Sequence, residues 1–313
     1  MEKLIDVVVV TYNRLPLLKE CLLSLLNQRD NLSGIFVVDN HSTDGTTAYL
    51  SSINDSLVKA TTLSDNIGGA AGFEYGVNQA MVEGTGRYIW IMDDDTIPNI
   101  GASSALLKTA KQLNDTFGFL CSNVRWTDGH ATNIAQVSKD WPEKISFGLV
   151  GTVSATFVSI LVPKENINRL GLPLGKMQIW GDDTEYTTRL SSFEASFFVS
   201  DSIAVHKTGY NLMQDSLKTI QADRIWRFKS MYRNLIYIKR HYASKRGVLK
   251  LVFENIVTGI GALAAKDHRL NRFGAAFFGT WNGFFFNPDV HFPDEVSSEK
   301  SKNEERSKKI LNG

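Results

Sequence analysis

The chain has 313 residues, of which 43% are hydrophobic and 21% are charged, and its formal net charge is +1. This much apolar material excludes a chain that is disordered along its whole length and allows one large domain with a substantial core. The two cysteines, Cys21 and Cys121, have no C-x-x-C spacing, so we expect buried free thiols rather than a zinc site.

The first residues lack a basic segment followed by a long apolar segment, which is the pattern of a secretion signal. No apolar run reaches the roughly 18 residues that a membrane-spanning helix needs. We therefore expect a cytoplasmic protein that is kept on the inner side of the membrane.

Expected strands and helices alternate in the first third of the chain. Short β-branched runs are typical of buried strands, and apolar residues three or four positions apart are typical of helices. Their alternation predicts βαβ units, and therefore an α/β domain with a mainly parallel sheet and flanking helices. The expected strands lie at 7–10, 35–38, 57–63 and 88–92, and the expected helices at 16–25 and 71–83.

Polar turns follow three of these expected strands. Thr11–Arg14 follows the first strand, Asp39 the second and Asp93–Asp95 the fourth. In a parallel sheet, ligands bind beyond the carboxyl ends of the strands. We therefore expect these side chains to converge on one site, although they lie far apart in the sequence.

The second half of the chain changes character, with shorter strands and then a helical region. A short helix is expected to begin at Ile179, and a strand is expected at 196–206. The later helices are distinguished by basic, aromatic or continuously apolar composition. They are expected at 219–242, 249–265 and 273–286.

This pattern divides the chain into three parts. Residues 1–215 are expected to form the catalytic domain, and residues 216–296 a helical extension. The charged tail at 297–313 has few apolar residues and is expected to be disordered.

Asp93-Asp94-Asp95 is the strongest local signal. Three adjacent carboxylates repel one another, and such a cluster is tolerated where a cation neutralises it. In an extended turn Asp93 and Asp95 point to the same side, where their oxygens suit Mn²⁺ or Mg²⁺ together with diphosphate oxygens. A solvated acidic loop is the alternative, but the position directly after a buried strand favours the metal site.

Asp39 and the glycine-rich segment Asn66–Phe73 are candidates for ligand binding. A carboxylate at the end of a strand can accept hydrogen bonds from a base or a ribose, and a turn or capping aspartate is the alternative. Asn66, Gly68 and Gly69 precede an expected helix, where glycine allows close backbone approach and the helix start favours anions. A tight turn is the alternative, because neither a P-loop nor a GxGxxG pattern is present.

A second acidic cluster, Asp182–Glu185, and His206 complete the candidates. A carboxylate of this cluster can serve as the general base that takes a proton from an attacking hydroxyl. An acidic helix start favoured by the helix dipole is the alternative. His206 ends an expected strand and can ligate a metal, with a structural histidine as the alternative.

Taken in order, these segments resemble the GT-A glycosyltransferases of family 2. The resemblance covers about residues 4–210, and the ordered set of motifs is more specific than any one of them. Within the family, Asn66–Phe73 and Asp182–Tyr186 look most like bacterial galactofuranosyltransferases, with rhamnosyltransferases as close neighbours. The matching segments are Thr11–Arg14, Val37–Thr46, Asn66–Gly69, Trp90–Asp95, Trp180–Tyr186 and His206.

The resemblance implies a role for each matching position. Asp183 is the expected catalytic base, and Trp180 and Asp182 are expected to line the acceptor site. Gly181 separates Trp180 from Asp182, unlike the galactofuranosyl pattern, in which tryptophan directly precedes the aspartate pair. The expected metal ligands are Asp93, Asp95 and His206, and the expected donor-binding residues are Thr11, Asn13, Arg14, Asp39, Asn66, Gly68, Gly69, Asp93 and Asp94.

The resemblance also implies an activity, which is inverting glycosyl transfer that depends on Mn²⁺ or Mg²⁺. UDP-galactofuranose is the expected donor, and a glycan or lipid-linked glycan is the expected acceptor, in bacterial surface polysaccharide synthesis. dTDP-rhamnose is the alternative donor. A nucleotidyltransferase is disfavoured because no basic glycine-rich signature accompanies the first strand. A non-catalytic nucleotide-sugar or glycan-binding protein is a further alternative, which the intact acidic residues disfavour.

A basic excess marks the start of the helical region. Residues 218–250 contain ten Lys or Arg and one acidic residue, and anionic headgroups attract such segments at roughly 1 kcal/mol per charge. The apolar stretches that follow are too short to span a bilayer, so we expect a peripheral protein whose helices lie in the membrane interface. Packing against the domain or in a homo-oligomer is the alternative. Nucleic acid is not an expected partner, because no recognised binding motif is present.

Overall fold

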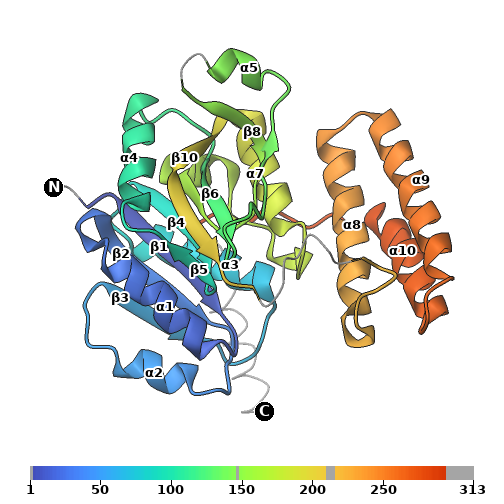
Figure 1. The fold of residues 1–313 in the computed structure, drawn as a ribbon, viewed down its shortest axis with the longest axis horizontal. Helices are drawn as coiled ribbons and strands as arrows, with labels where there is room; N and C mark the ends of the chain where they lie inside the picture. Colours follow the sequence, from blue (N-terminus) through green and yellow to red (C-terminus); the bar gives the residue numbers. More distant parts are fainter. Residues whose placement is uncertain (1–2, 146–147, 209–215, 294–313) are drawn as a thin grey trace, which may run out of the picture.

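The computed structural model describes residues 3–145, 148–208 and 216–293. Figure 1 shows a twisted sheet with helices on both faces and, beside it, a bundle formed by α8, α9 and α10. The described residues up to 208 are called the sheet domain below, and α8, α9 and α10 are called the helical bundle.

The Val-rich strand β1 (Ile5–Thr11) forms the centre of the first half of the sheet. It pairs in parallel with β2 (Leu32–Asp39) on one side and with β4 (Tyr88–Asp93) on the other. β3 (Val58–Thr62) extends this parallel half beyond β2. The four expected strands are therefore present, and their carboxyl ends lie at one edge.

The second half of the sheet contains the antiparallel strands. β9 (Ile160–Pro163) runs antiparallel between β4 and β6 (Leu120–Trp126), and β10 (Ser196–His206) runs parallel to β6. The order is β3-β2-β1-β4-β9-β6-β10-β8-β7, and β5 pairs with β10. The expected mainly parallel α/β fold is confirmed. The remaining strands are β5 (Thr96–Pro98), β7 (Gln136–Val137) and β8 (Val150–Ser154).

Helices cover both faces of the sheet, as Figure 1 shows. One hydrophobic core includes α1 (Leu15–Leu26) and α4 (Ala102–Gln112), and the other includes α3 (Gly69–Glu83) and α7 (Asp182–Phe193). Shorter elements connect the strands. They are α2 (Thr46–Ser52), α5 (Trp141–Lys144), α6 (Lys164–Leu170) and the 3-10 turns η1 (Arg29–Asn31) and η3 (Gly175–Met177).

Alternate side chains of β1 point into the two cores, as the period of two in a strand requires. Val7 and Val9 belong to the core under α1 and α4, whereas Val8 and Val10 belong to the core under α3 and α7. Gly76 allows α3 to lie close to the sheet, because a Cβ at this position would be only 2.7 Å from Val8 Cγ1. This packing fixes the start of α3, and with it the glycine-rich loop, at the carboxyl edge of the sheet.

The helical bundle consists of α8 (Ile225–Tyr242), α9 (Lys245–Ala262) and α10 (Arg269–Gly283). Phe228 and Tyr232 of α8 pack with small residues of α9 and α10 in a third hydrophobic cluster. The sequence placed these helices correctly but not their ends. α8 begins after the 3-10 turn η5 (Ala222–Arg224), and the three phenylalanines at 284–286 follow the end of α10.

The bundle contacts the sheet domain through α8 and through the chain that follows α10. Asn234 of α8 contacts the loop before α7, as described below. After α10 the chain returns to the sheet domain, where the Leu172 backbone N–H donates to the His291 carbonyl at 2.8 Å. His291 Nδ1 also lies 2.8 Å from Glu74 Oε1 on α3. The bundle therefore packs against the sheet domain through α8 and through the chain after α10.

Two sequence predictions concern the borders of the residues that the structure describes. The predicted domain boundary at 215–216 adjoins a segment outside the described residues, and the charged tail at 297–313 lies entirely outside them. Among the described residues, no helix combines the length and apolar content needed to cross a bilayer.

Candidate active site

Asp93, Asp95 and His206 lie together because β5 pairs with the end of β10. β4 ends at Asp93, and beyond the acidic turn Thr96 of β5 pairs with His206. The Lys207 backbone N–H also donates to the Asp95 carbonyl at 2.8 Å. One ligand atom from each of the three side chains lies within 4.8 Å of the others. Strand pairing thus assembles the three expected metal ligands.

Asn133 fixes the orientation of the buried His206 ring. His206 Nδ1 lies 2.8 Å from Asn133 Oδ1. Because an amide oxygen only accepts hydrogen bonds, Nδ1 carries the proton in this contact. In the neutral ring Nε2 then keeps its lone pair, and Nε2 faces Asp95 Oδ1 at 3.0 Å.

The donor set fits a divalent cation such as Mn²⁺ or Mg²⁺. Within the described ranges, the buried Asp95 Oδ1 receives no hydrogen bond of good geometry. A buried carboxylate oxygen without a donor is costly, and a cation between Asp95 and Asp93 would remove that cost. Carboxylate oxygens are the ligands that both ions prefer, and His206 adds a nitrogen.

The electrostatics of the cluster also favour a cation. Burial and then the charge of Asp95 raise the pKa of Asp93 to about 6. Burial raises the pKa of Asp94 to about 7, although the charge of Arg14 opposes the shift. For Asp95 burial acts in the same direction, but contact with His206 and the charges of His206 and Arg14 outweigh it and lower the pKa. Burial would lower the pKa of His206, yet Asp95 and Asp93 raise it overall.

Thr11 and Arg14 anchor the acidic turn. Thr11 Oγ1 donates to Asp94 Oδ2 at 2.7 Å, and Arg14 Nη1 pairs with both Asp94 and Asp95. The Arg14 side chain is 49% exposed, so it also faces the solvent side of the site. The two residues were expected to bind the donor nucleotide. In the structure they hold the carboxylates, and their contact with a nucleotide stays a prediction.

Asp39 and Asn13 organise the neighbouring loops. Asp39 is fully buried, and its oxygens accept hydrogen bonds from the Ser42 backbone N–H at 2.9 Å and from Thr47 Oγ1 at 2.6 Å. This is the turn-forming role that the sequence left open as an alternative. Asn13, with a φ of 53°, accepts from the Thr43 backbone N–H at 2.7 Å. Nucleotide binding by either residue stays a prediction.

The Asn66–Gly69 loop lies against the segment that precedes the second acidic cluster. Asn66 Oδ1 accepts from the Gly68 backbone N–H at 2.9 Å, and Gly68 has a φ of 88°, which favours glycine. A Cβ at Gly68 would lie 3.2 Å from the Gln178 carbonyl oxygen, which also accepts from the Ala70 backbone N–H. The expected donor loop and the loop before α7 are therefore in direct contact.

Asp182 and Asp183 begin α7 after Gly181, which has a φ of 100°. Thr184 donates to Asp183 Oδ1 through its backbone N–H at 2.6 Å and its hydroxyl at 3.2 Å. Burial raises the pKa of Asp183, although Thr184 opposes the shift. Burial and then the Asp183 charge raise the pKa of Asp182 to about 8. The charge of Asp183 also contributes to the raised pKa of Asp93, so the two acidic clusters interact electrostatically.

Trp180 packs against the helical bundle. Its ring centroid lies 5.2 Å from that of Phe228 on α8, with the planes at 85°. The Trp180 carbonyl accepts from Asn234 Nδ2 at 2.7 Å. The inserted Gly181 is closely packed, because a Cβ there would lie 3.1 Å from Asn234 Cβ. Contact between Trp180 or Asp182 and an acceptor stays a prediction.

Three further residues of the site were not found in the sequence, namely Asn133, Gln178 and Asn234. Asn234 is fully buried, and its Nδ2 also donates to the Met177 carbonyl at 3.0 Å. No motif marks Asn133 or Gln178. For Asn234 one signal exists, because it lies among mainly apolar residues on the buried side of α8, one turn after the polar Ser230. Buried polar side chains are hydrogen-bonded, so such a residue indicates a contact beyond the helix.

Comparison with known proteins supports the same class of fold. Residues 6–152, a little under half of the chain, match the family model described as glycosyl transferase family 2. No curated protein sequence matches the chain significantly.

Several solved structures share the fold at low sequence identity. GalNAc-T7, solved with UDP, GalNAc and Mn²⁺, is 16% identical with a TM-score of 0.60, covering 87% of this chain and 54% of that one. S. aureus TarS is 17% identical with a TM-score of 0.51, covering 90% and 54%. Mannosyltransferase PcManGT from Pyrobaculum calidifontis, solved with GDP-Man and Mn²⁺, is 18% identical with a TM-score of 0.56, covering 90% and 87%.

The chain thus spans about half the length of the GalNAc-T7 and TarS chains, and identities this low show the fold alone. Taken together, residues 6–152 match the family model described as glycosyl transferase family 2, and the fold of the chain is of the GT-A type found in these neighbours.

Proposed function

We propose that this chain is a metal-dependent, inverting glycosyltransferase that uses a nucleotide-sugar donor. One observation carries the proposal. Asp93, Asp95 and His206, which could together hold a metal ion, cluster at the carboxyl edge of the sheet, and Asp183 interacts electrostatically with Asp93. A cation can stabilise the diphosphate that leaves, and a carboxylate base can take the proton of the attacking hydroxyl.

In the proposed reaction Asp183 is the base, and the nucleoside diphosphate is the leaving group. Asp183 Oδ2 accepts the proton of an acceptor hydroxyl, and the hydroxyl oxygen forms a bond to the anomeric carbon of the donor. The bond between that carbon and the diphosphate breaks, and its electron pair leaves with the nucleoside diphosphate. A cation held by Asp93, Asp95 and His206 would stabilise the leaving charge. Attack opposite the leaving group inverts the anomeric configuration.

The donor we propose is UDP-galactofuranose, on the strength of the Asn66–Phe73 and Asp182–Tyr186 segments. dTDP-rhamnose is the second candidate, from the same resemblance. A donor panel tests this, with release of nucleoside diphosphate measured with and without EDTA. We expect metal-dependent release with one donor, and NMR of the product should show an inverted anomeric centre. Retention of configuration, or no metal-dependent release from any donor, would contradict the proposal.

We also propose that the outer face of the bundle lies on an anionic membrane surface, where a lipid-linked acceptor would be found. Large apolar side chains at helical spacing are exposed on α9, with Leu249 at 69% and Phe253 at 68%, and on α10, with Leu270 at 77%. Six basic and two acidic residues lie between 245 and 285. Basic residues beside exposed aromatic ones complement an anionic interface.

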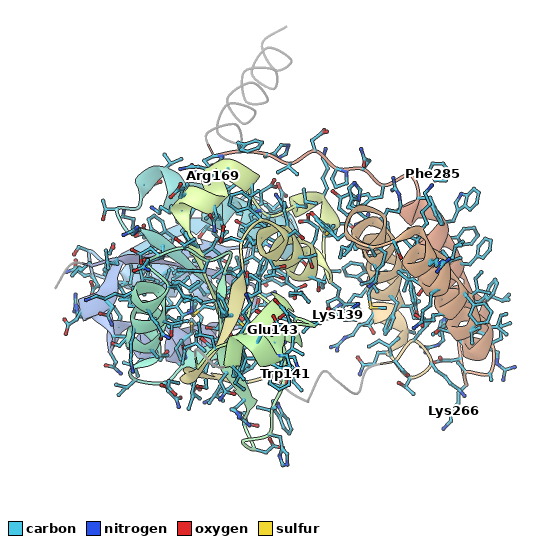
Figure 2. All side chains as sticks on the ribbon, turned by 90° about the horizontal axis from the view of Figure 1, so that it is seen from above. Lys139, Trp141, Glu143, Arg169, Lys266 and Phe285 are labelled. Atoms are coloured by element: carbon cyan, nitrogen blue, oxygen red, sulfur yellow. The ribbon has the colours of Figure 1, made fainter. Side chains whose placement is uncertain are left out.

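Figure 2 shows the extent of this face, with Lys266 and Phe285 at opposite ends of the bundle. Phe285 is 71% exposed and follows α10, whereas Phe286 is partly buried. The Phe286 ring lies 5.7 Å from that of Tyr237 and 4.0 Å from the Arg233 guanidinium carbon. Of the three phenylalanines at 284–286, we therefore propose that Phe284 and Phe285 enter the interface.

A further inference from the structure

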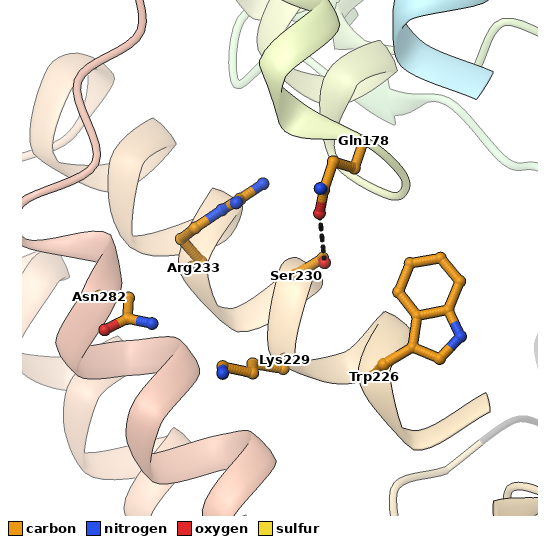
Figure 3. Close-up of a pocket in the computed structure, with 6 residues that line it drawn as sticks. All are labelled: Gln178, Trp226, Lys229, Ser230, Arg233 and Asn282. Atoms are coloured by element: carbon orange, nitrogen blue, oxygen red, sulfur yellow. Dashed lines mark hydrogen bonds between the residues drawn. The ribbon is translucent and has the colours of Figure 1, made fainter. Parts of the chain in front are cut away.

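A cavity of 280 Å³ lies between the sheet domain and the helical bundle, as shown in Figure 3. Gln178 forms its wall on the sheet domain, and α8 and α10 form the other walls. Small-molecule sites have volumes of roughly 300–1,000 Å³, so this cavity suits one sugar unit with a phosphate rather than a long glycan. The lining residues are Gln178, Trp226, Lys229, Ser230, Arg233 and Asn282.

The lining is positively charged. Lys229 and Arg233 lie one helical turn apart on α8, and no acidic residue is among the six that line the cavity. Arg233 Nε donates to Asn234 Oδ1 at 3.0 Å, and Nη2 donates to the carbonyls of Lys176 and Met177 at 3.2 and 3.0 Å. These bonds hold the guanidinium in place and leave Nη1 for an anionic ligand.

The remaining lining can recognise a neutral sugar ring. Trp226 is 51% exposed and offers an indole face. Gln178 and Asn282 contribute amide groups, and Ser230 Oγ donates to Gln178 Oε1 at 3.4 Å. Amides and hydroxyls both donate and accept hydrogen bonds, as sugar hydroxyls do. A phosphate-bearing sugar would therefore find complementary groups for both of its parts.

The cavity shares one loop with the transfer site. The Gln178 side chain lines the cavity, while the Gln178 carbonyl contacts Gly68 and Ala70 of the expected donor loop. Asp182 and Asp183 follow on the same segment at the start of α7. A ligand in the cavity would therefore lie beside the segment that presents the proposed base.

We propose that this cavity binds a phosphate group of the acceptor. Lys229 and Arg233 contact the phosphate oxygens, and Trp226 packs against the adjoining sugar, while another hydroxyl of the same acceptor reaches Asp183. The acceptors of this chain are then phosphate-bearing, either as lipid-diphosphate-linked sugars or as phosphate-containing glycans. The inference rests on the proposed glycosyl transfer.

Binding is tested with galactose 1-phosphate and with galactose by isothermal titration. The protein is saturated with UDP and Mg²⁺, so that the donor site is filled and cannot contribute. We expect galactose 1-phosphate to bind at least about tenfold more tightly than galactose, because a charge-assisted contact to phosphate contributes roughly ten- to a hundredfold. Equal affinities for the two compounds would overturn the proposal.

Single substitutions test whether galactose 1-phosphate binds in this cavity. Lys229→Glu is expected to weaken galactose 1-phosphate binding roughly ten- to a hundredfold. Lys239→Glu is the matched control, because Lys239 is exposed on the same helix and does not line the cavity. An equal loss in both variants would show a diffuse charge effect and overturn the assignment. Trp226→Ala should weaken galactose 1-phosphate binding but not inorganic phosphate binding, and unchanged affinities would remove the proposed contact with the sugar.

Competition distinguishes the two sources of phosphate. Stronger displacement of galactose 1-phosphate by geranyl diphosphate than by glycerol 3-phosphate assigns a lipid-diphosphate acceptor, and the reverse order assigns a phosphate-containing glycan. Failure of both competitors contradicts the proposal. Binding of UDP with Mn²⁺ is measured separately. Its absence in the wild-type protein would count against the proposed function, whereas loss of phosphate binding alone would count only against the cavity.

Discussion

His206 Nε2 faces the buried Asp95 Oδ1 at 3.0 Å, while Asn133 Oδ1 holds the opposite ring nitrogen at 2.8 Å. The ring is therefore oriented before any cation binds. Because second residues of this kind set the tautomer and direction of a histidine ligand, Asn133 acts as a positioning residue for the proposed metal site.

Asn133→Ala is expected to lower Mn²⁺ affinity by about ten- to a hundredfold, which is the usual effect of losing such a partner. Isothermal titration or Mn²⁺ electron paramagnetic resonance measures the change. Asn123→Ala is a suitable control, since Asn123 lies on β6 and accepts a hydrogen bond from Arg125 instead. Equal Mn²⁺ affinity in the Asn133 variant and the wild type would show that the ring needs no such support.

Asp183→Asn is expected to reduce sugar transfer by at least about 10²–10⁴-fold, because the amide cannot accept the acceptor's proton. Binding of UDP with Mn²⁺ should change little, since the Asp93 cluster is intact. Both are measured on the same preparation. Transfer at the wild-type rate would exclude Asp183 as the base, and loss of UDP binding would show a structural defect instead.

Asp182→Asn is expected to stabilise the metal-free protein increasingly as the pH rises. Burial and the Asp183 charge raise the pKa of Asp182 from its ordinary value of 3.8 to about 8. A raised folded-state pKa stabilises the fold fully below the ordinary value, and this contribution is lost as the pH rises towards the folded-state value.

The expected gain of the Asp182 variant over the wild type is therefore small near pH 4, grows between pH 4 and pH 8, and exceeds about 1 kcal/mol at the upper end. Urea unfolding at several pH values measures it. A difference in unfolding free energy that stays constant with pH would show that Asp182 does not titrate in this window.

Asn234→Ala is expected to free the loop before α7 from the bundle. The buried amide donates to the carbonyls of Met177 and Trp180, and leaving these unpaired costs about 1–3 kcal/mol. Hydrogen exchange of residues 177–181 should become faster, and transfer activity should fall. Asn255→Ala is the matched control, because Asn255 bonds Thr280 at 2.9 Å inside the bundle.

If both asparagine variants lose similar stability but only Asn234→Ala speeds exchange in the loop, α8 positions that loop. Faster loop exchange in the Asn255 variant as well would mean that the bundle acts only through general stability.

The double variant Phe253→Ser with Phe285→Ser is expected to weaken binding to vesicles that contain anionic lipid. If the membrane buries both phenylalanine rings, their loss reduces the free energy of membrane binding by roughly 3 kcal/mol or more. Co-sedimentation measures the binding, which should also weaken as salt is added. Ile134→Ser is the control, since Ile134 is 66% exposed on the sheet domain. Failure of the wild type to bind vesicles, together with a dimer in light scattering, would assign the face to a second subunit.

The sequence by itself determined the fold class and the edge of the sheet at which the acidic residues meet. The continuous β-branched run Val7–Val10 indicates a strand buried on both faces, and parallel strands bring their carboxyl ends to one edge. The positions of Asp39 and Asp93 follow from that rule alone. These two positions could be predicted because each aspartate directly follows an apolar run in the sequence.

The tertiary structure alone decided which groups face one another across that edge. The β5–β10 pairing brings His206 to Asp95, and the docking of α8 attaches Asn234 to the loop before Asp183. These contacts join positions more than 50 residues apart through single hydrogen bonds that leave no periodic pattern. The cationic cavity has the same origin, because Gln178 and Lys229 become its walls only when the bundle packs against the sheet domain.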